Sequence, residues 1–420
     1  QKFAKPTRVM TVKEARIVSY STSLTMEVEK NENKKHKYKP FHETFALCTL
    51  SLAVSFMYPN PTTVIKRMIF VTGSIFINCV EVFWFFSYSY KCIVLKDFYN
   101  LSRNTTLNIV FFLFIFKTYY AVYLTKPYAN LLKKMSEDLL EANNLNEKCQ
   151  KIYDDHIKQG KHAEIVWIVT PIILSAIYPI YSGVAMSYSS FKTDNFTRYM
   201  VHDMDLLFVE DIQYEAPFFH CMYIYNIVQC IVMVPNFGGL DGSFCIATIH
   251  LQLKLKLMIR RAKDAFENSK DCYELRREMR NTIKRHQDAL NFYNEIHSLY
   301  GFWLLIVFLV TAFLISLNLY QIYVLQRMDP KYLVFFIASV RHMYLPCRYA
   351  SNLCEVILYD LYCLPWEQWA DPVVTDLLIL MIARSQRPLH LTGSGMVTFN
   401  MELFKSILQT SYSFYTLITA

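Results

Sequence analysis

The sequence predicts an all-α membrane protein with seven transmembrane helices, a cytoplasmic N-terminus and an extracellular C-terminus. Three observations support this fold class. Of the 420 residues, 53% are hydrophobic, 16% are aromatic and only 19% are charged, whereas soluble domains carry about 25% charged residues. Seven apolar windows have roughly the 20 residues that a helix needs to cross a bilayer. Basic residues and glycosylation sequons are also divided unequally between the two sides of these windows.

The N-terminal segment, residues 1–62, is rich in charged residues and is expected in the cytoplasm. It contains one apolar stretch, residues 43–57, which ends before Pro59 and Pro61. That stretch is too short to span a bilayer comfortably, so we expect a re-entrant or interfacial helix.

The seven windows are assigned as membrane spans. The first four lie within residues 63–245, the next two within 302–357 and the last within 396–420. Pro235 and the run Phe237-Gly238-Gly239 are expected to break the fourth span near its inner end. The spans are placed at residues 68–90, 105–126, 163–187, 216–245, 302–326, 332–357 and 396–418.

Two inner segments, 246–301 and 358–395, are expected to be structured. In the first, apolar residues recur among Lys and Glu at helical spacing, which predicts helices that extend the neighbouring spans into the cytoplasm. In the second, Asp371 followed by Pro372 is typical of an N-cap with proline at the first helical position. This pair predicts a short helix over residues 371–387.

The orientation follows from the basic residues. With the N-terminus inside, the inner segments hold 32 Lys and Arg residues and the outer segments hold 7, as the positive-inside rule requires. The three glycosylation sequons begin at Asn100, Asn104 and Asn195, and all three fall in expected outer loops. Chance alone accounts for three sequons, but their agreement with the charge distribution supports this orientation.

Sequence motifs give no sign of an enzyme, a cofactor or a nucleic-acid partner. The chain has no P-loop, GxGxxG, HExxH or GxSxG motif, and its histidines lack metal-ligand spacing. The basic runs sit among acidic residues and are typical of solvated helix faces. No CxxC occurs, and cysteines such as Cys79, Cys230 and Cys347 lie inside apolar runs, which predicts reduced, packed thiols.

Charged residues inside predicted spans are costly and therefore informative. Glu81 in the first span and Lys117 in the second lie at similar depth, so we expect them to form a structural pair. Arg341, with His342 beside it in the sixth span, is expected to face a cavity, whereas Arg348 is expected near the inner interface.

The last span carries a polar stripe. Lys405, Gln409, Tyr412 and Thr416 are spaced so that they share one face of a helix, with Glu402, Ser406 and Ser413 beside it. Such a face must contact water or protein, because lipid would leave its polar groups unsatisfied. It is either a pore wall or a surface that forms hydrogen bonds with other helices.

Aromatic residues crowd the outer halves of the second, third, fourth and sixth spans. Interfacial belts explain some of them, and a small apolar pocket with a few hydroxyl groups would explain the rest. The candidate pocket residues are Phe111, Phe112, Tyr178, Tyr181, Phe218, Phe219, Met222, Tyr223, Tyr332, Phe335 and Phe336.

The C-terminal region resembles a known family signature. The stretch from Ser385 reads Ser-Gln-Arg-Pro-Leu-His-Leu-Thr-Gly-Ser-Gly and is followed by Phe399, Phe404-Lys-Ser-Ile-Leu-Gln and Ser411-Tyr-Ser-Phe-Tyr. This pattern resembles the end of insect odorant receptors, and the predicted layout of the whole chain agrees with theirs. The Ser-Tyr-Ser motif of the last helix is similar to the motif at this place in tuning subunits, whereas the last helix of the co-receptor lacks it.

The resemblance implies a ligand-gated, non-selective cation channel subunit. It implies a heterotetramer with the shared co-receptor in the plasma membrane of olfactory sensory neurons, with small volatile apolar molecules as ligands. Spans one to six would form the ligand-binding region, and segments 246–301 and 358–395 the cytoplasmic anchor. The last helix would line the pore with Lys405, Gln409, Ser411, Tyr412 and Thr416, and the constriction would lie near Ser411 and Tyr412.

Two other classes stay open at the level of sequence. A seven-span G-protein-coupled receptor predicts an outer N-terminus, an Asp/Glu-Arg-Tyr motif after the third span and an Asn-Pro-x-x-Tyr motif in the seventh. Both motifs are missing at those places. A small-molecule transporter predicts inverted repeats with paired broken helices, and only the fourth span looks broken. The sequence does not name a ligand.

Overall fold

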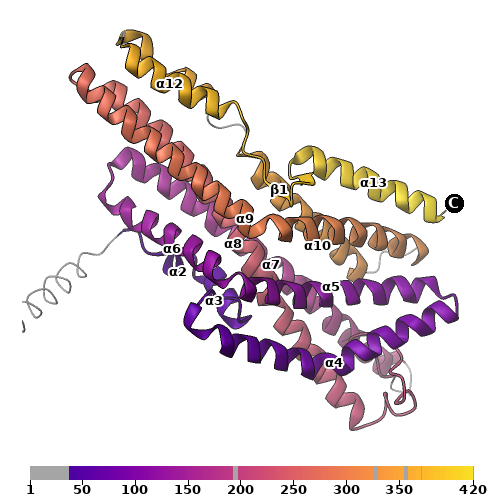
Figure 1. The fold of residues 1–420 in the computed structure, drawn as a ribbon. Coiled ribbons are helices and arrows are strands. Elements are labelled where there is room, and N and C mark those ends of the chain that lie inside the picture. The colour runs from indigo at the N-terminus through magenta and orange to yellow at the C-terminus, as the bar shows by residue number, and fades with distance from the viewer. Residues whose placement is uncertain (1–36, 193–196, 326–329, 354–357, 370, 420) are drawn as a thin grey trace, which may run out of the picture.

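The computed structural model describes residues 37–192, 197–325, 330–353, 358–369 and 371–419. The long helices lie side by side as a bundle (Figure 1). They are α4 (Val64–Val94), α5 (Phe98–Tyr123), α7 (Glu147–Lys192), α8 (Phe218–Asn268), α9 (Cys272–Leu325), α10 (Pro330–Ser351) and α13 (Met401–Thr419). Each contains or largely overlaps one of the seven predicted spans, which confirms the all-α arrangement of seven helices, while the sides on which the two termini lie stay a prediction.

Five of the described helices are long and apolar enough to cross a membrane: α4, α5, α7, α8 and α9. Helices α10 and α13 have 22 and 19 residues. At 1.5 Å per residue, even α13 reaches about 28 Å, close to the thickness of the hydrocarbon core. Their lower hydropathy has a visible cause, because α10 carries Arg341 and Arg348 and α13 carries the polar stripe.

The ends of the bundle separate the connections into two groups (Figure 1). The α4–α5 turn, the segment 197–217 and the C-terminal end of α13 lie at one end, which we call the outer end. The turn between α8 and α9 lies at the other, inner end, together with α12 (Pro372–Ser385). This arrangement fits the predicted succession of spans, while the assignment of the inner end to the cytoplasm stays a prediction.

Short elements fill the inner half. They are α2 (Phe41–Thr44), α3 (Ala46–Val54), η1 (Pro61–Thr63), α6 (Thr125–Glu141), η2 (Ala142–Asn144), α11 (Leu358–Tyr362) and η3 (Trp366–Gln368). The apolar stretch predicted at 43–57 forms α2 and α3. One face of α3 buries Cys48 and Leu52, and the other exposes Leu50 and Val54, so the helix packs on the bundle and still presents an apolar face outward.

The predicted break in the fourth span is wrong, because α8 continues through Pro235 and both glycines for 51 residues. The glycines serve close packing instead. A Cβ at Gly239 would lie 2.9 Å from Leu52 Cδ2, and one at Gly238 would lie 3.3 Å from the Trp167 carbonyl oxygen. The missing side chains let α3 and α7 approach α8, as small residues do between membrane helices.

The start of the last helix also differs from prediction. Residues before Met401 form a hairpin of β1 (Thr392–Gly393) and β2 (Val397–Thr398), paired antiparallel. The Ser394 amide donates to the Gly301 carbonyl oxygen at 3.1 Å. A Cβ at Gly393 would lie only 3.0 Å from backbone atoms of Leu305. The Thr-Gly-Ser-Gly part of the signature therefore docks the chain on α9 immediately before α13.

The short helix predicted at 371–387 is α12, and its start confirms the predicted cap. The Asp371 carboxylate accepts from the amides of Val373 and Val374 at 2.9 and 3.4 Å. It also pairs with Arg276 of α9 at 2.8 Å, and this hydrogen bond holds the pKa of Asp371 below its usual value. The pair joins the two segments that were predicted to form the inner anchor.

The surface agrees with an embedding in lipid. Large apolar side chains are exposed along the outer faces of the bundle, including Phe76 and Ile77 on α4, Val184 on α7 and Ile231 on α8. Soluble monomers rarely expose continuous apolar surface of this kind. The cysteines of the described residues are free. Cys347 is buried as predicted, whereas Cys79 is exposed on this surface.

Candidate functional site

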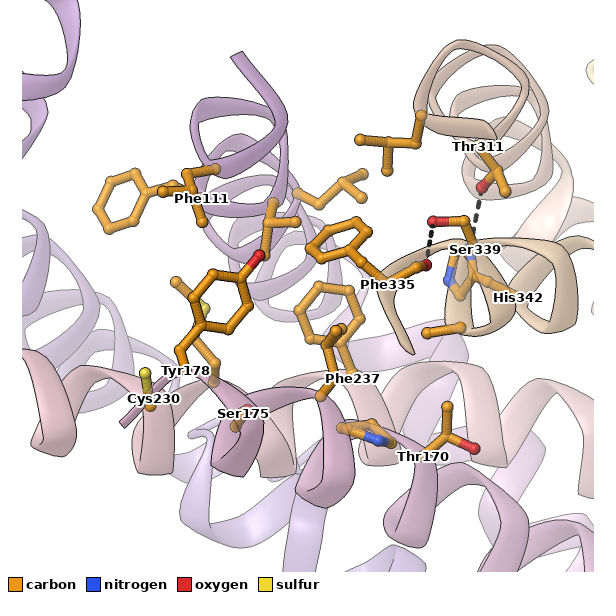
Figure 2. A pocket seen from close by; sticks show the side chains of 18 of the residues that line it. Phe111, Thr170, Ser175, Tyr178, Cys230, Phe237, Thr311, Phe335, Ser339 and His342 are labelled. Atoms are coloured by element: carbon orange, nitrogen blue, oxygen red, sulfur yellow. Dashed lines mark hydrogen bonds between the residues drawn. The ribbon is translucent and has the colours of Figure 1, made fainter. Parts of the chain in front are cut away.

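A cavity of about 140 Å³ lies in the outer half of the bundle, between α4, α5, α7, α8, α9 and α10. Figure 2 shows Tyr178 of α7 and Phe335 of α10 pointing toward each other across it, with Phe111 of α5 at one side. Almost all of its wall is apolar. It is comparable in size to cavities that hold a single benzene ring.

The aromatic wall is held by ring contacts between α4 and α5 and within α5. The Phe85 ring of α4 lies 6.5 Å from the Phe111 ring, and Phe111 lies 6.2 Å from Phe114. Such tilted pairs add about 0.5–1.5 kcal/mol each beyond the area that they bury. On α10, the Ser339 hydroxyl donates to the Phe335 carbonyl oxygen at 2.9 Å, so it is satisfied within its own helix.

The outer end of the cavity is closed by the segment 197–217. Its His202 side chain contacts the rings of Phe85 and Tyr178, at 6.2 and 5.8 Å between ring centroids. Two ion pairs attach the segment to the helices: Arg103 of α5 pairs with Asp203 at 3.0 Å, and Lys91 of α4 pairs with Asp205 at 2.9 Å. Burial, with the nearby charges of Lys331 and Arg103, lowers the pKa of His202 to about 4, so the imidazole is neutral at pH 7.

The inner end of the cavity rests on a buried polar network. Lys117 Nζ of α5 pairs with Asp241 Oδ2 of α8 at 2.5 Å, and Asp241 Oδ1 accepts from Trp303 Nε1 of α9 at 3.0 Å. His342 of α10 adds Nε2 at 3.6 Å from Asp241, and its Nδ1 lies 2.9 Å from Thr311 Oγ1. The network therefore joins four helices directly below the cavity.

The predicted pairing of Glu81 with Lys117 is wrong. Lys117 is fully buried against Asp241, and its ammonium also lies over the Phe237 ring, 3.8 Å from the centroid. Glu81 lines the cavity, is 3% exposed and leaves its Oε2 without a hydrogen-bond partner. Equal depth in two spans did not identify the pair, because Asp241 lies on the helix that faces Lys117.

Three of the eleven predicted pocket residues line the cavity: Phe111, Tyr178 and Phe335. Phe112 and Tyr181 are exposed on the outside of the bundle, and Tyr332 is buried with its hydroxyl 3.1 Å from that of Tyr99. The rest of the set packs elsewhere. Phe218 and Met222 pack against the cluster around Phe85. Phe219 and Tyr223 pack against each other, and Phe336 lies in a groove beside α13.

Other lining residues were not singled out from the sequence as pocket residues. The aromatic ones include Phe85, Trp167 and Phe237, and the polar ones include Glu81, His202, Gln229 and Thr311. Arg341, which was expected to face a cavity, also lines this one. The presence of a charge within a span was the available signal for Glu81, whereas no sequence signal marked which face of α7 or α8 turns inward.

The polar stripe of α13 lies on an exposed face. Lys405, Gln409, Tyr412 and Thr416 are exposed in the single chain. Ser411 is not with them, because it is 2% exposed and its hydroxyl lies 3.4 Å from the Ala312 carbonyl oxygen of α9. Helix α13 packs on α9 and α10, and the four stripe residues lie on its exposed face.

The three sequons differ in their surroundings. Asn100 lies in the first turn of α5, where its Nδ2 donates to Asp97 at 2.6 Å. Asn104 is 2% exposed, and its Nδ2 donates to the Phe85 carbonyl oxygen and to Ser89 Oγ at 2.7 and 2.6 Å. The predicted position of Asn104 in an outer loop is therefore wrong, because this residue is buried within α5. Asn195 lies outside the described residues.

Metal binding has no structural support in the described segments, where no group of three or more His, Cys, Asp or Glu side chains is placed to hold an ion.

Comparisons with known proteins agree on one family. The family model described as 7tm Odorant receptor matches residues 97–412. Odorant receptor 10 of Aedes albopictus is 22% identical over 77% of this chain and 84% of its own length. Odorant receptor 85f of Drosophila melanogaster is 20% identical over 72% of this chain and 76% of its own length.

A solved structure gives the same fold. The insect olfactory receptor OR5 from Machilis hrabei, in complex with eugenol, superposes with a TM-score of 0.69. The match covers 90% of this chain and 99% of the other, at 14% identity. At that identity the likeness establishes the arrangement of helices alone.

Proposed function

Because the chain belongs to the odorant receptor family, we propose that it is a tuning subunit of an odour-gated, non-selective cation channel. The observation that carries this proposal is an apolar, aromatic cavity between the membrane helices, in a chain whose last helix presents a polar face. Family membership disfavours the G-protein-coupled receptor and transporter alternatives. The proposal assigns the chain no catalytic step and no cofactor.

Ligand binding is placed in the cavity. A small, largely apolar molecule reaches it from the lipid or the outer face and gains free energy by leaving water, about 25 cal/mol per Å² of apolar surface buried. Rings from α5, α7 and α10 converge on the cavity, and these are Phe111, Tyr178 and Phe335. A molecule bound there contacts several helices at once, so the cavity is sensitive to how those helices are spaced.

Coupling to the pore runs through α9 and α10. Both helices line the cavity, and both pack against α13. A ligand opens the channel only to the extent that it binds the open arrangement more tightly than the closed one. A shift of α10 relative to α9 moves α13, because Ser411 and Phe404 anchor that helix to α9 and to Tyr344 of α10.

The pore is assigned to the exposed face of α13, with Lys405, Gln409, Tyr412 and Thr416 toward the axis. In this assignment Ser411 lies on the opposite side of α13 and contacts α9 through its hydroxyl. Four such helices, contributed by this subunit and the shared co-receptor in a heterotetramer, would surround the conduction path. The localisation that follows is the plasma membrane of olfactory sensory neurons. Hydroxyl and amide groups along a pore replace part of the hydration of a passing cation.

The experiment is cation current from cells that co-express the chain with the co-receptor, tested against a panel of volatile compounds. Adjacent aromatic residues supply matched controls. Phe111→Ala and Phe335→Ala enlarge the cavity and are expected to shift the half-maximal ligand concentration by about tenfold or more. Phe112→Ala, which removes a ring from the exposed surface, leaves it unchanged. Equal effects at Phe111 and Phe112, or no ligand-evoked current, would contradict the proposal.

A further inference from the structure

The cavity contains one buried carboxyl group without a charged partner. Glu81 is 3% exposed on α4 and contributes to the cavity wall. Its Oε2 has no hydrogen-bond partner, and no salt bridge involves Glu81 among the residues that the structure describes. A membrane-embedded acidic group in this condition is expensive to maintain unless something binds it.

Neighbouring groups on α8 do not fully satisfy this carboxyl. The Tyr225 hydroxyl donates to Asn78 Oδ1 at 2.8 Å and also lies within hydrogen-bond reach of the Glu81 carboxyl, while the Gln229 amide donates to Asn78. Asn78, nearly one turn earlier on α4, thus takes the Gln229 donor and competes with Glu81 for the Tyr225 hydroxyl. Lys117 is paired with Asp241, and Arg341, on the wall of the same cavity, forms no salt bridge with Glu81 in the part of the chain that the structure describes. The unpaired oxygen of Glu81 is left at the cavity wall.

We propose that Glu81 anchors the polar head of the ligand and selects small, largely apolar molecules that carry one hydrogen-bond donor, a hydroxyl or an amine. The inference rests on the proposed function and specifies its ligand class. A donor satisfies the carboxyl whether it is ionised or protonated, whereas a ligand with only an acceptor oxygen satisfies the protonated form alone. The volume of about 140 Å³ suits one ring with a short substituent.

The rings around Glu81 are compatible with either head group. Phe85, one turn along α4, and Phe111 and Tyr178 present apolar surface to the body of a ligand. Aromatic faces also attract an ammonium group, most strongly where water is excluded. The other buried polar atoms of the lining without a hydrogen-bond partner are His202 Nδ1 at the outer end and His342 Nε2 at the inner end, where it lies 3.6 Å from Asp241. An imidazole donates from one nitrogen and accepts at the other, so neither predicts a preference for donors.

The test uses the full chain with the co-receptor and four probes of equal size: benzyl alcohol, benzylamine, benzaldehyde and ethylbenzene. Activation is read as current, and binding is read as thermal stabilisation of the purified complex. In the wild type, benzyl alcohol or benzylamine is expected to act at concentrations about tenfold or more below ethylbenzene, because a buried group left unpaired is costly. Benzaldehyde is expected to resemble ethylbenzene more closely than the two donors.

Variants then assign the preference to its residue. Glu81→Leu is expected to abolish the advantage of the donors while keeping the response to ethylbenzene, which shows that the variant is folded. Glu81→Gln keeps an acceptor oxygen without a charge, so it is expected to retain the alcohol and lose the amine advantage. If Glu81→Leu does not reach the cell surface, the difference in potency between benzyl alcohol and benzylamine in Glu81→Gln decides whether Glu81 is the anchor.

Several results would overturn the inference. They are equal potency of all four probes, an unchanged ranking in Glu81→Leu, loss of donor preference in His202→Asn instead, or no stabilisation by any probe. The proposed function is judged separately by the wider panel of volatile compounds. Current evoked by other volatiles without a preference for donors refutes the role of Glu81 and leaves the channel proposal standing.

Discussion

Replacing Lys117 with methionine tests the polar network below the cavity. Methionine keeps the length and the apolar stem of lysine and removes the ammonium group. The substitution leaves the Asp241 carboxylate, whose side chain is 4% exposed, with the indole donor of Trp303 and the more distant His342. Nothing else on the described chain is placed to neutralise that carboxylate.

The magnitude follows from burial. Removing one member of a fully buried ion pair typically costs about 3–5 kcal/mol, because the other charge is left uncompensated. The side chain of Lys117 has no exposed surface, so solvent screening does not reduce this cost. For a chain of this size, such a loss of stability lowers the midpoint temperature of thermal unfolding by roughly 3–6 °C. Removing both charges is far less costly, since buried pairs contribute little net stability.

The assay compares thermal stability of the purified complex for Lys117→Met, Asp241→Asn and the double variant. Asparagine keeps an oxygen that can accept from Trp303. Each single variant is expected to lose several kcal/mol, and the double variant is expected to recover at least about 2 kcal/mol of the summed loss, which is the coupling energy of the cycle. Additive losses, or a Lys117→Met variant as stable as the wild type, would refute the pairing.

Three further predictions follow from local contacts. Gly393→Ala is expected to destabilise the chain by about 1–3 kcal/mol, because a Cβ there meets the α9 backbone. The control is Gly73→Ala, which has open space around it and is expected to leave the thermal unfolding midpoint unchanged. Limited proteolysis of the segment 197–217 is expected to accelerate as pH falls from about 6.5 to 4, because His202 takes up a proton in the unfolded segment at a higher pH than in the folded, buried state. The loss of folding free energy over this range is at most about 3 kcal/mol. The same acceleration in His202→Asn would contradict an origin in His202. Asn104→Gln is expected to leave the glycosylated mass unchanged and to lower stability by about 1 kcal/mol through lost hydrogen bonds; a shift in electrophoretic mobility would show that Asn104 is accessible.

The number and order of the spans could be predicted because their signals are one-dimensional. An apolar window of membrane length and the distribution of Lys and Arg need no knowledge of contacts. The start of α12 was equally local, since Asp371 and Pro372 specify a cap by themselves. These features confirm that the layout of the membrane helices is encoded segment by segment.

The site was harder to predict because it depends on which face of each helix turns inward. Phe111 and Phe112 are chemically identical neighbours, yet a rotation of about 100° per residue places one in the cavity wall and the other on the outer surface. The same rotation separates Phe335 from Phe336. The aromatic composition identified four of the six helices that line the cavity and missed α4 and α9, and only packing distinguishes the residues on each helix.

Pairing across the bundle was predicted incorrectly for a related reason. Lys117 and Asp241 are 124 positions apart, and their contact depends on how α5 and α8 are rotated. Asp241 lies inside the fourth predicted span, so the signal of a charge within the membrane was present. The glycines next to it looked like a break, although they allow close packing of α3 and α7.

The central claim is that a ligand in the cavity opens a pore lined by the exposed face of α13. The direct test places single cysteines at Gln409, Tyr412 and Thr416, with Ser411 as the buried control, and follows their reaction with a charged, water-soluble thiol reagent during current recording. The account predicts modification of the three exposed positions, faster when a ligand is bound, and little modification at Ser411. Protection of all three from the reagent with and without ligand, or equal modification of Ser411, would contradict it.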